Sequence, residues 1–392
     1  MLNTEMLSKG GPRLLVTDRE GALYLERARI HVENDRVVYH IAGDEHCREY
    51  NIPHVNLAVL FIGQGASITQ DAMRLLGEEG VHLAVTGSGG TPLHMGALTA
   101  YTSTRHFREM LPIYLSAEAS LAAAKSVMRD RTARMRKIGV QGAQKMLKVR
   151  DVPGLSRCCS VFDANLKECR DVQQLLGFEG QFSKSCYAAF AQATTPPEAA
   201  GNADRKPGAS KKNVFRRDPG ARRPPPAKGG DDESSKMINR LIDHGNYLCY
   251  GMAGAALWAL GIPPHMSVFH GKTRAGGLVF DLADSFKDAL VLPLAFAHAP
   301  DKSGEEVEKA FRGRLIAAFD QHRILKEAIE TVERMILAAQ PRDPSQIECS
   351  SSNAAAGFRT AADAGADAGA DAGAVERDVA DGPASSSLDC GF

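Results

Sequence analysis

The chain has 392 residues, which is enough for two domains with cores of their own and for segments that pack with neither. Its 44% hydrophobic and 24% charged residues are typical of a soluble globular protein, so composition alone excludes neither an enzyme nor a scaffold. The formal net charge of zero averages two opposed regions: from Gln340 onward three arginines stand against nine acidic residues, and the rest of the chain is correspondingly basic.

The sequence gives no sign of export or of a membrane anchor. No run of about 18 uncharged apolar residues is present, and residues 1–13 lack the apolar centre of a signal peptide. The eight cysteines contain no CxxC pair, which argues against a zinc ribbon and a disulfide scaffold. We therefore expect a cytoplasmic protein with reduced thiols and no membrane partner.

Residues 1–97 are predicted to form a β-rich domain. Apolar and polar residues alternate over 22–41, on both sides of a polar turn at 33–35, which favours a hairpin. Further strands are expected at 14–17, 54–63 and 81–87, with one amphipathic helix over 69–80 and a glycine-rich turn at 87–90.

From residue 98 the apolar residues recur with a helical period, and no strand pattern follows until Ser267–Phe269. We expect an α-helical domain made of residues 98–193 and 236–338. Residues 194–235 are rich in Pro, Gly, Ala and basic side chains, and residues 339–392 are acidic and contain Ala-Asp-Ala-Gly repeats. Both segments have too few apolar residues to offset their conformational entropy, so we expect a disordered basic insertion and a disordered acidic tail.

One segment concentrates acidic residues. If a helix begins near Leu278, then Asp281, Asp284 and Asp288 lie at i, i+3 and i+7 on one face, a short turn after His270. Stacked like charges repel, so a compensating cation is expected, either a divalent metal ion or Lys287. A solvated acidic helix face explains the spacing equally well.

A second acidic residue stands out because of its neighbours. Glu179 lies among apolar residues and glycines in the segment Leu-Leu-Gly-Phe-Glu-Gly, residues 175–180. A glutamate at a helix start, where it stabilises the helix dipole, is the simpler explanation, and association with other site residues is the alternative.

Together these motifs resemble a known family. The order of residues 175–180, Tyr187, Asn246, His270 and the Asp281/Asp284 pair resembles the CRISPR-associated integrase family, that of the first-numbered Cas protein. The runs 51–53, 63–69, 89–93 and 279–293 are similar to its type I-F branch. The resemblance covers roughly residues 12–335 without the insertion.

The resemblance implies an α+β fold with a β-sandwich-like N-terminal domain and an all-α catalytic domain, assembled as a homodimer. It implies that Glu179, His270 and Asp284 hold Mg²⁺ or Mn²⁺, with Asp281 as a supporting acid. The implied reaction is a metal-dependent transesterification that joins 3′-hydroxyl ends of spacer DNA to the repeat array in CRISPR adaptation. The implied partners are DNA and the second-numbered Cas protein, fused to a helicase-nuclease.

Basic residues provide candidate DNA contacts. Lys272, Arg274 and Lys287 lie near the acidic cluster and are candidates for binding the scissile phosphates. Residues 105–150 and the insertion are basic enough to bind a DNA backbone, although solubility explains much of this charge. Two other functions stay open: a repair nuclease acting on branched DNA with the same metal site, and a catalytically degenerate DNA-binding scaffold.

Overall fold

The computed structural model describes residues 19, 21–41, 48–86, 93–95, 104–150, 152–194, 215–218, 233–271, 276–297 and 304–340. The strand expected at 14–17, the turn at 87–90, most of the insertion and the tail from residue 341 lie outside these residues. Within the described part of the chain, no helix is long and apolar enough to span a bilayer.

The N-terminal part contains two four-stranded sheets, of order β1-β5-β7-β8 and β4-β3-β2-β6. Residues from both sheets, among them Ile30, Val37 and Leu60, share one core with α1. Thr69 caps that helix, because its hydroxyl accepts a hydrogen bond from the Ala72 amide at 3.3 Å. The elements are β1 (Gly21–Leu25), β2 (Ala28–Glu33), β3 (Arg36–Ile41), β4 (Glu49–Asn51), β5 (Leu57–Ile62), β6 (Ser67–Ile68), α1 (Gln70–Glu78), β7 (His82–Val85) and β8 (Leu93–Met95).

The predicted hairpin is confirmed in its second half. β2 pairs with β3 in antiparallel register across Asn34 and Asp35, whose φ angles of 49° and 59° are those of a two-residue hairpin turn. The run 22–41 is not one hairpin, however, because β1 ends at Leu25 and pairs in parallel with β5 in the other sheet. Arg27, with φ of 50°, makes the change of direction.

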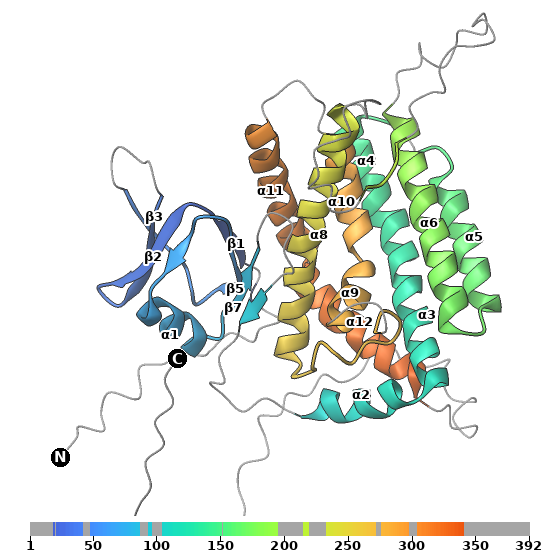
Figure 1. Cartoon of the computed structure of the whole chain (residues 1–392), viewed down its shortest axis with the longest axis horizontal. Helices are drawn as coiled ribbons and strands as arrows, with labels where there is room; N and C mark the ends of the chain where they lie inside the picture. The colour runs from blue at the N-terminus through green and yellow to red at the C-terminus, as the bar shows by residue number, and fades with distance from the viewer. Residues whose placement is uncertain are drawn as a thin grey trace, which may run out of the picture. The chain divides into compact units, whose positions relative to one another are not determined.

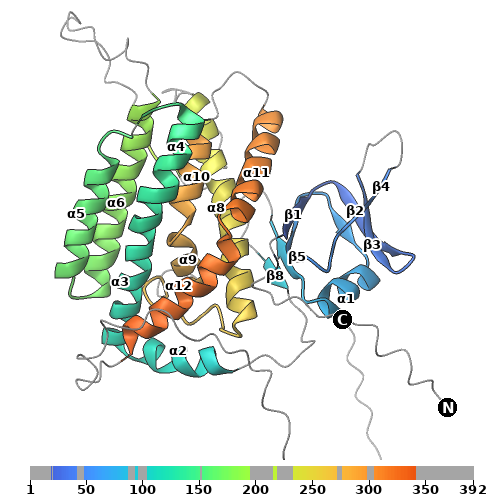
Figure 2. The same ribbon diagram turned by 180° about the vertical axis from the view of Figure 1, so that it is seen from behind.

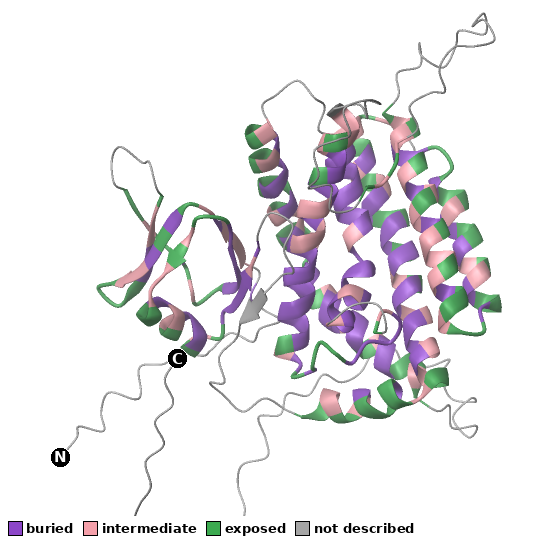
Figure 3. Ribbon diagram, viewed as in Figure 1, coloured by how far each residue is buried: buried purple, intermediate pink, exposed green. Residues whose placement is uncertain are grey.

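Helices make up the rest of the described chain, and α10 lies at their centre (Figures 1 and 2). It contacts α8, α4 and η3, and Figure 3 shows buried residues along α8, α9 and α10. The π-helical turn η3 joins α3 to α4. The elements are α2 (Arg105–Leu115), α3 (Ala117–Arg134), η3 (Met135–Gly139), α4 (Val140–Leu147), α5 (Leu155–Glu168), α6 (Val172–Ala193), α8 (Glu233–Ala259), α9 (Gly277–Asp284), α10 (Lys287–Phe296), α11 (Gly304–Gln321) and α12 (Ile324–Ala339).

The helix expected from Leu278 through Asp288 is broken, so the predicted i, i+3, i+7 stack of three carboxylates on one helix is wrong. α9 ends at Asp284, and α10 begins at Lys287. The Ser285 amide and hydroxyl both donate to the Leu282 carbonyl, at 3.1 and 2.8 Å, which tightens the last turn and redirects the chain. The strand pattern at 267–269 likewise forms a bend instead of a strand.

The sheet and the helices share apolar contacts at β5. Phe61 is fully buried and belongs to the same core cluster as the helices. A Cβ atom at Gly251 of α8 would lie 2.2 Å from the Phe61 ring, so only glycine allows this approach. The core of the helical part therefore continues onto two strands of the N-terminal sheets, β5 and, through Ala84, β7.

Candidate active site

A turn after α8 holds His270 against the start of α9. The carboxylate of Asp281, which is fully buried, accepts hydrogen bonds from the backbone amides of Val268, Phe269 and His270 at 2.7, 3.3 and 3.1 Å. It also accepts from the Ser267 hydroxyl at 2.7 Å. A single side chain thus organises the whole turn and compensates for its own burial.

Asp281 also orients the imidazole ring. Its Oδ1 lies 2.9 Å from Nδ1 of His270. Because a carboxylate accepts and does not donate, Nδ1 carries the hydrogen, and the lone pair of the neutral ring is then on Nε2. This arrangement is the one by which metal-binding histidines are commonly oriented.

Two glycines allow this close packing. Gly276 has φ of +69°, which favours glycine, at the residue before α9. A Cβ atom at Gly277 would lie 2.7 Å from Cβ of Ser267. The sequence Gly-Gly before the predicted helix therefore has a steric function: it brings the turn within hydrogen-bonding distance of Asp281.

Arg131 of α3 connects three helices in the interior. Its side chain is 2% exposed and donates to Glu179 at 2.7 Å, to Ser183 at 2.7 Å and, through Nε at 3.1 Å and Nη2, to Asp288. The Ser183 hydroxyl also donates to Glu179, at 2.8 Å. Glu179 lies well inside α6, so the helix-terminal explanation of this residue is wrong.

Asp284 connects His270 to a second cation. One of its oxygens forms an ion pair with the ammonium group of Lys287, and the other lies 3.9 Å from Nδ1 of His270. The Lys287 ammonium lies 6.0 Å from the centre of the Tyr250 ring on α8, which adds a cation–π contact. The Asp284 side chain is 2% exposed and that of Lys287 is 14% exposed, so the pair is shielded from water.

These contacts shift the ionisation of the buried groups. Burial raises the pKa of Glu179, but Arg131 and then Lys287 lower it to about 2. Burial lowers the pKa of Lys287, but Asp284 and other anionic neighbours raise it above its usual value. Arg131 behaves in the same way, since Asp288, Glu179 and Asp284 together raise its pKa despite its burial. Glu179, Arg131 and Lys287 are therefore charged at neutral pH.

The structure places the four predicted catalytic residues in two ion-pair groups, one of Glu179 with Arg131 and Asp288, and one of His270, Asp281, Asp284 and Lys287. The two groups influence each other electrostatically, Lys287 acting on Glu179 and Asp284 on Arg131, and together they form a charged network. Four carboxylates, those of Glu179, Asp281, Asp284 and Asp288, are connected to two cations and His270. The formal charge of this set is −2 with a neutral imidazole, which one divalent cation would balance. Two carboxylates and an imidazole also suit Mg²⁺ or Mn²⁺ in chemical type.

The ligand atoms of the three predicted metal ligands do not converge on a single point. Among the described residues, the ligand atoms of Glu179, His270 and Asp284 do not all lie within 4.8 Å of one another. Arg131 and Lys287 hold the carboxylates instead, so Lys287, one of the two compensating cations considered from the sequence, is paired with Asp284. Lys272 and Arg274, the other predicted phosphate ligands, lie outside the described residues.

Sequence reasoning missed the role of Arg131, which it counted among basic residues facing DNA. Arg131 and Arg134 are 2% and 7% exposed, so neither contributes to a basic surface. The spacing of Arg131 could have shown that it faces inward. It follows Val127 by four positions and Met128 by three, and both of these apolar residues are buried in α3. An arginine that continues a buried stripe is expected to bind buried acids.

A short part of the predicted insertion, residues 215–218, packs near this network. The Phe215 ring lies 6.1 Å from that of Tyr187 on α6 and 5.0 Å from that of Phe296 on α10. Arg217 donates to Asn239 at 2.9 Å and forms an ion pair with Asp243 on α8. Burial and Asp288 raise the pKa of Tyr187 to about 12, so this ring, which packs against Phe215, is influenced by the charge of Asp288.

The chain is similar to a described family over most of its length. The family "CRISPR associated protein Cas1" matches residues 14–303. A curated relative from Pectobacterium atrosepticum, named a CRISPR-associated endonuclease Cas1, is 32% identical over 333 residues, which are 82% of this chain and 93% of the relative.

Solved structures agree on the fold. A casposase bound to an integration product superimposes with a TM-score of 0.59 at 16% identity, covering 84% of this chain and 94% of that one. A chain of a Cas6-RT-Cas1–Cas2 complex gives a TM-score of 0.53 at 15% identity, covering 82% of this chain and 35% of that chain. At such identities the agreement concerns the fold.

Proposed function

The chain belongs to the Cas1 family of CRISPR-associated proteins, and on that premise we propose that it is a divalent-metal-dependent DNA endonuclease and integrase of CRISPR adaptation. The relative named an endonuclease supports the nuclease class, and the casposase bound to an integration product supports strand joining. The observation that supports the proposal is that Asp284 lies 3.9 Å from His270 in a shielded turn, while Lys287, its ion-pair partner, acts electrostatically on Glu179 of α6.

The proposed reaction is a transesterification at phosphorus. The 3′-hydroxyl of a spacer end attacks a phosphodiester of the repeat; a new P–O bond forms while the bond to the leaving 3′-oxygen breaks. The attacking hydroxyl gives up its proton, and the leaving oxygen takes one up. One phosphodiester bond replaces another, so the reaction needs no nucleotide hydrolysis. When bound, Mg²⁺ or Mn²⁺ supplies charge stabilisation at the phosphoryl and leaving oxygens.

The chain's own residues have separate parts in this proposal. Glu179, Asp284 and Nε2 of His270 would hold the cation, and Asp281 positions the imidazole through Nδ1. With Asp284 neutralised in this way, Lys287 would donate to a phosphate oxygen. Arg131 stays in place and keeps the Glu179 carboxylate ionised.

The proposed partners follow from the family and the resemblance. We propose that a homodimer binds DNA together with the second-numbered Cas protein, fused to a helicase-nuclease as in the type I-F branch. The Cas6-RT-Cas1–Cas2 complex supports the partnership with a Cas2 protein. The basic residues of the insertion would add salt-sensitive affinity for the DNA backbone.

Strand joining into a supercoiled, repeat-bearing plasmid tests the proposal, with the partner protein and Mn²⁺ or Mg²⁺ present. We expect joined product from the unmodified chain and none from Asp284→Ala or His270→Ala. Asp163→Ala is the matched control, because this carboxylate pairs with Arg136 and accepts a hydrogen bond from Thr132, and it is not a partner of Glu179, His270 or Asp284. Full activity of Asp284→Ala would refute the site. Cleavage without joining would instead identify a nuclease of branched DNA, and binding without cleavage or joining would identify a scaffold.

A further inference from the structure

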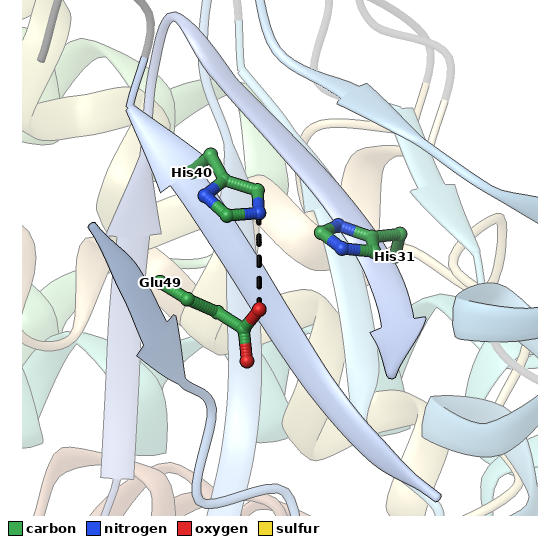
Figure 4. A group of neighbouring side chains, drawn as sticks. All are labelled: His31, His40 and Glu49. Carbon is green, nitrogen blue, oxygen red and sulfur yellow. Dashed lines mark ion pairs between the residues drawn. The ribbon is translucent and has the colours of Figure 1, made fainter. Parts of the chain in front are cut away.

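A second group of metal-binding side chains lies on the N-terminal sheet, on β2, β3 and β4. His40 of β3 is paired with Arg29 on one side and with Glu49 of the edge strand β4 on the other. His31 follows Arg29 by two positions on β2, so it lies on the same face of the sheet, diagonally across from His40. Figure 4 shows His31, His40 and Glu49 gathered on this face.

The distances within this group are short. The two imidazole rings are stacked, with centroids 5.0 Å apart and planes at 16°. Nε2 of His40 lies 3.9 Å from Oε2 of Glu49, and one ligand atom each from His31, His40 and Glu49 lie within 4.8 Å of one another (Figure 4). Among the described residues, no other set of three or more acidic, histidine or cysteine side chains brings its ligand atoms within 4.8 Å of one another.

One ring nitrogen of the group lacks a hydrogen-bond partner. Nδ1 of His31 is buried and has no hydrogen-bond partner among the described residues, which is an unfavourable state for a ring nitrogen. Nδ1 of His40 lies 3.2 Å from the carbonyl of Arg48; with the hydrogen on that nitrogen, the lone pair on Nε2 is directed toward Glu49.

The carboxylates of the group also repel each other. Glu33, two residues after His31 on β2, lies 3.7 Å from Nε2 of His31 and shares a hydrogen bond with Glu49. Two carboxylates beside two imidazoles would be compensated by a divalent cation.

We propose that His31, His40 and Glu49 bind a divalent transition-metal ion of the Zn²⁺ class, with Glu33 or a water molecule as the fourth ligand. Two imidazole nitrogens and one carboxylate oxygen are a donor set that Zn²⁺ favours over Mg²⁺. Ligand atoms of tetrahedral Zn²⁺ lie about 3.3 Å apart, given bonds of about 2.0 Å. Glu49, whose side chain is 39% exposed, has the freedom to close the remaining distance by rotation.

Such an ion would add a link to the short edge strand β4. β4 has three residues and lies at the edge of its sheet, paired only with β3 in the described sheet order. An ion bound by His31, His40 and Glu49 would link β4 to both strands of the hairpin. The site is thus structural and separate from the network of Glu179 and Asp284.

Titration of the full, metal-stripped chain with Zn²⁺ against a chromophoric chelator tests the proposal. We expect one Zn²⁺ equivalent that is lost in the double variant His31→Gln/His40→Gln. That equivalent should be retained in Asp284→Ala, which separates this site from the candidate active site. His54→Gln is the matched histidine control, since its Nδ1 lies 3.2 Å from the carbonyl of Ile52 instead of within the group.

Two further measurements sharpen the result. Replacement of Zn²⁺ by Co²⁺ should give the intense visible absorption of a tetrahedral site in the unmodified chain and lose it in the double variant. Zn²⁺ should also raise the Tm of the unmodified chain and not that of the double variant. An unchanged Zn²⁺ stoichiometry in the double variant, or an equivalent that is lost only in Asp284→Ala, overturns the proposal.

Discussion

Replacement of Arg131 by methionine removes the cation that Glu179 and Asp288 share, while the apolar stem of the side chain is kept. The side chains of the two acids are 18% and 4% exposed, so water cannot replace the guanidinium. Removing one partner of a buried ion pair costs about 3–5 kcal/mol, because the remaining charge stays buried without compensation. We expect a loss of this size, against a total stability of about 5–15 kcal/mol for a typical domain.

The same variant should change the pH dependence of stability. The folded-state pKa of Glu179 is about 2, below its ordinary value of 4.5. The ionised Glu179 carboxylate therefore stabilises the fold by an amount of the order of 3 kcal/mol. This contribution is complete above pH 4.5 and is lost as the pH falls toward 2. Without Arg131 the largest cause of the low pKa of Glu179 is lost, so lowering the pH should destabilise the fold less through this group.

Urea unfolding followed by circular dichroism between pH 3 and pH 7 measures both effects. Arg136→Met is the matched control: Arg136 pairs with Asp163 at the surface, with side chains 38% and 31% exposed, and such pairs contribute about 0–1 kcal/mol. If Arg131→Met destabilised the chain no more than Arg136→Met at pH 7, the inferred role of the buried guanidinium would be wrong.

Three other substitutions test separate parts of the structure. Asp281→Asn should lower strand joining roughly 10–100-fold with His270 still present, because it disturbs the ring orientation; an unchanged rate would contradict this role. Burial, Arg312 and Arg240 lower the pKa of His244 to about 4, so between pH 6.5 and pH 4 only the unfolded chain binds a proton at this residue, and the fold loses of the order of 3 kcal/mol of stability. The variant His244→Leu should not show this loss; equal pH profiles of the variant and the unmodified chain in urea unfolding would refute it. Lys287→Met should strengthen Mn²⁺ binding to Asp284 about tenfold in calorimetric titration, equivalent to about 1.4 kcal/mol, whereas weaker binding would show that the ammonium does not compete.

Local sequence patterns predicted the elements whose cause is local. The hairpin turn at Asn34 and Asp35 and the cap at Thr69 depend on residues within a few positions of one another. The division between β1 and β2 was missed, because the alternation of apolar residues continues through Arg27, where the chain changes sheets. The break after Asp284 was missed for a similar reason: Ser285 and Phe286 are not residues that end helices by themselves.

The candidate site could be predicted in its acidic residues and in Lys287, but not in Arg131. Asp281 and Asp284 share one short helix with a fixed spacing, and His270 is tied to Asp281 across 11 positions. Arg131 and Asp288, by contrast, are 157 positions apart and meet only through the packing of α3 against the other helices. No local pattern specifies such a pair, although the buried stripe of α3 shows that Arg131 faces inward.

The two cations of the network differ in a way that suits a metal site. The guanidinium of Arg131 is planar and donates to three side chains at once, so its geometry is fixed and it serves as a permanent counter-charge. The ammonium of Lys287 is a single charge on a flexible stem, more exposed than Arg131, and it forms its ion pair with Asp284 alone among the described carboxylates. Arg131 keeps the Glu179 carboxylate ionised whether or not an ion is present. A divalent ion held by Asp284 would therefore take over the counter-charge that Lys287 supplies there, while Arg131 stays in place.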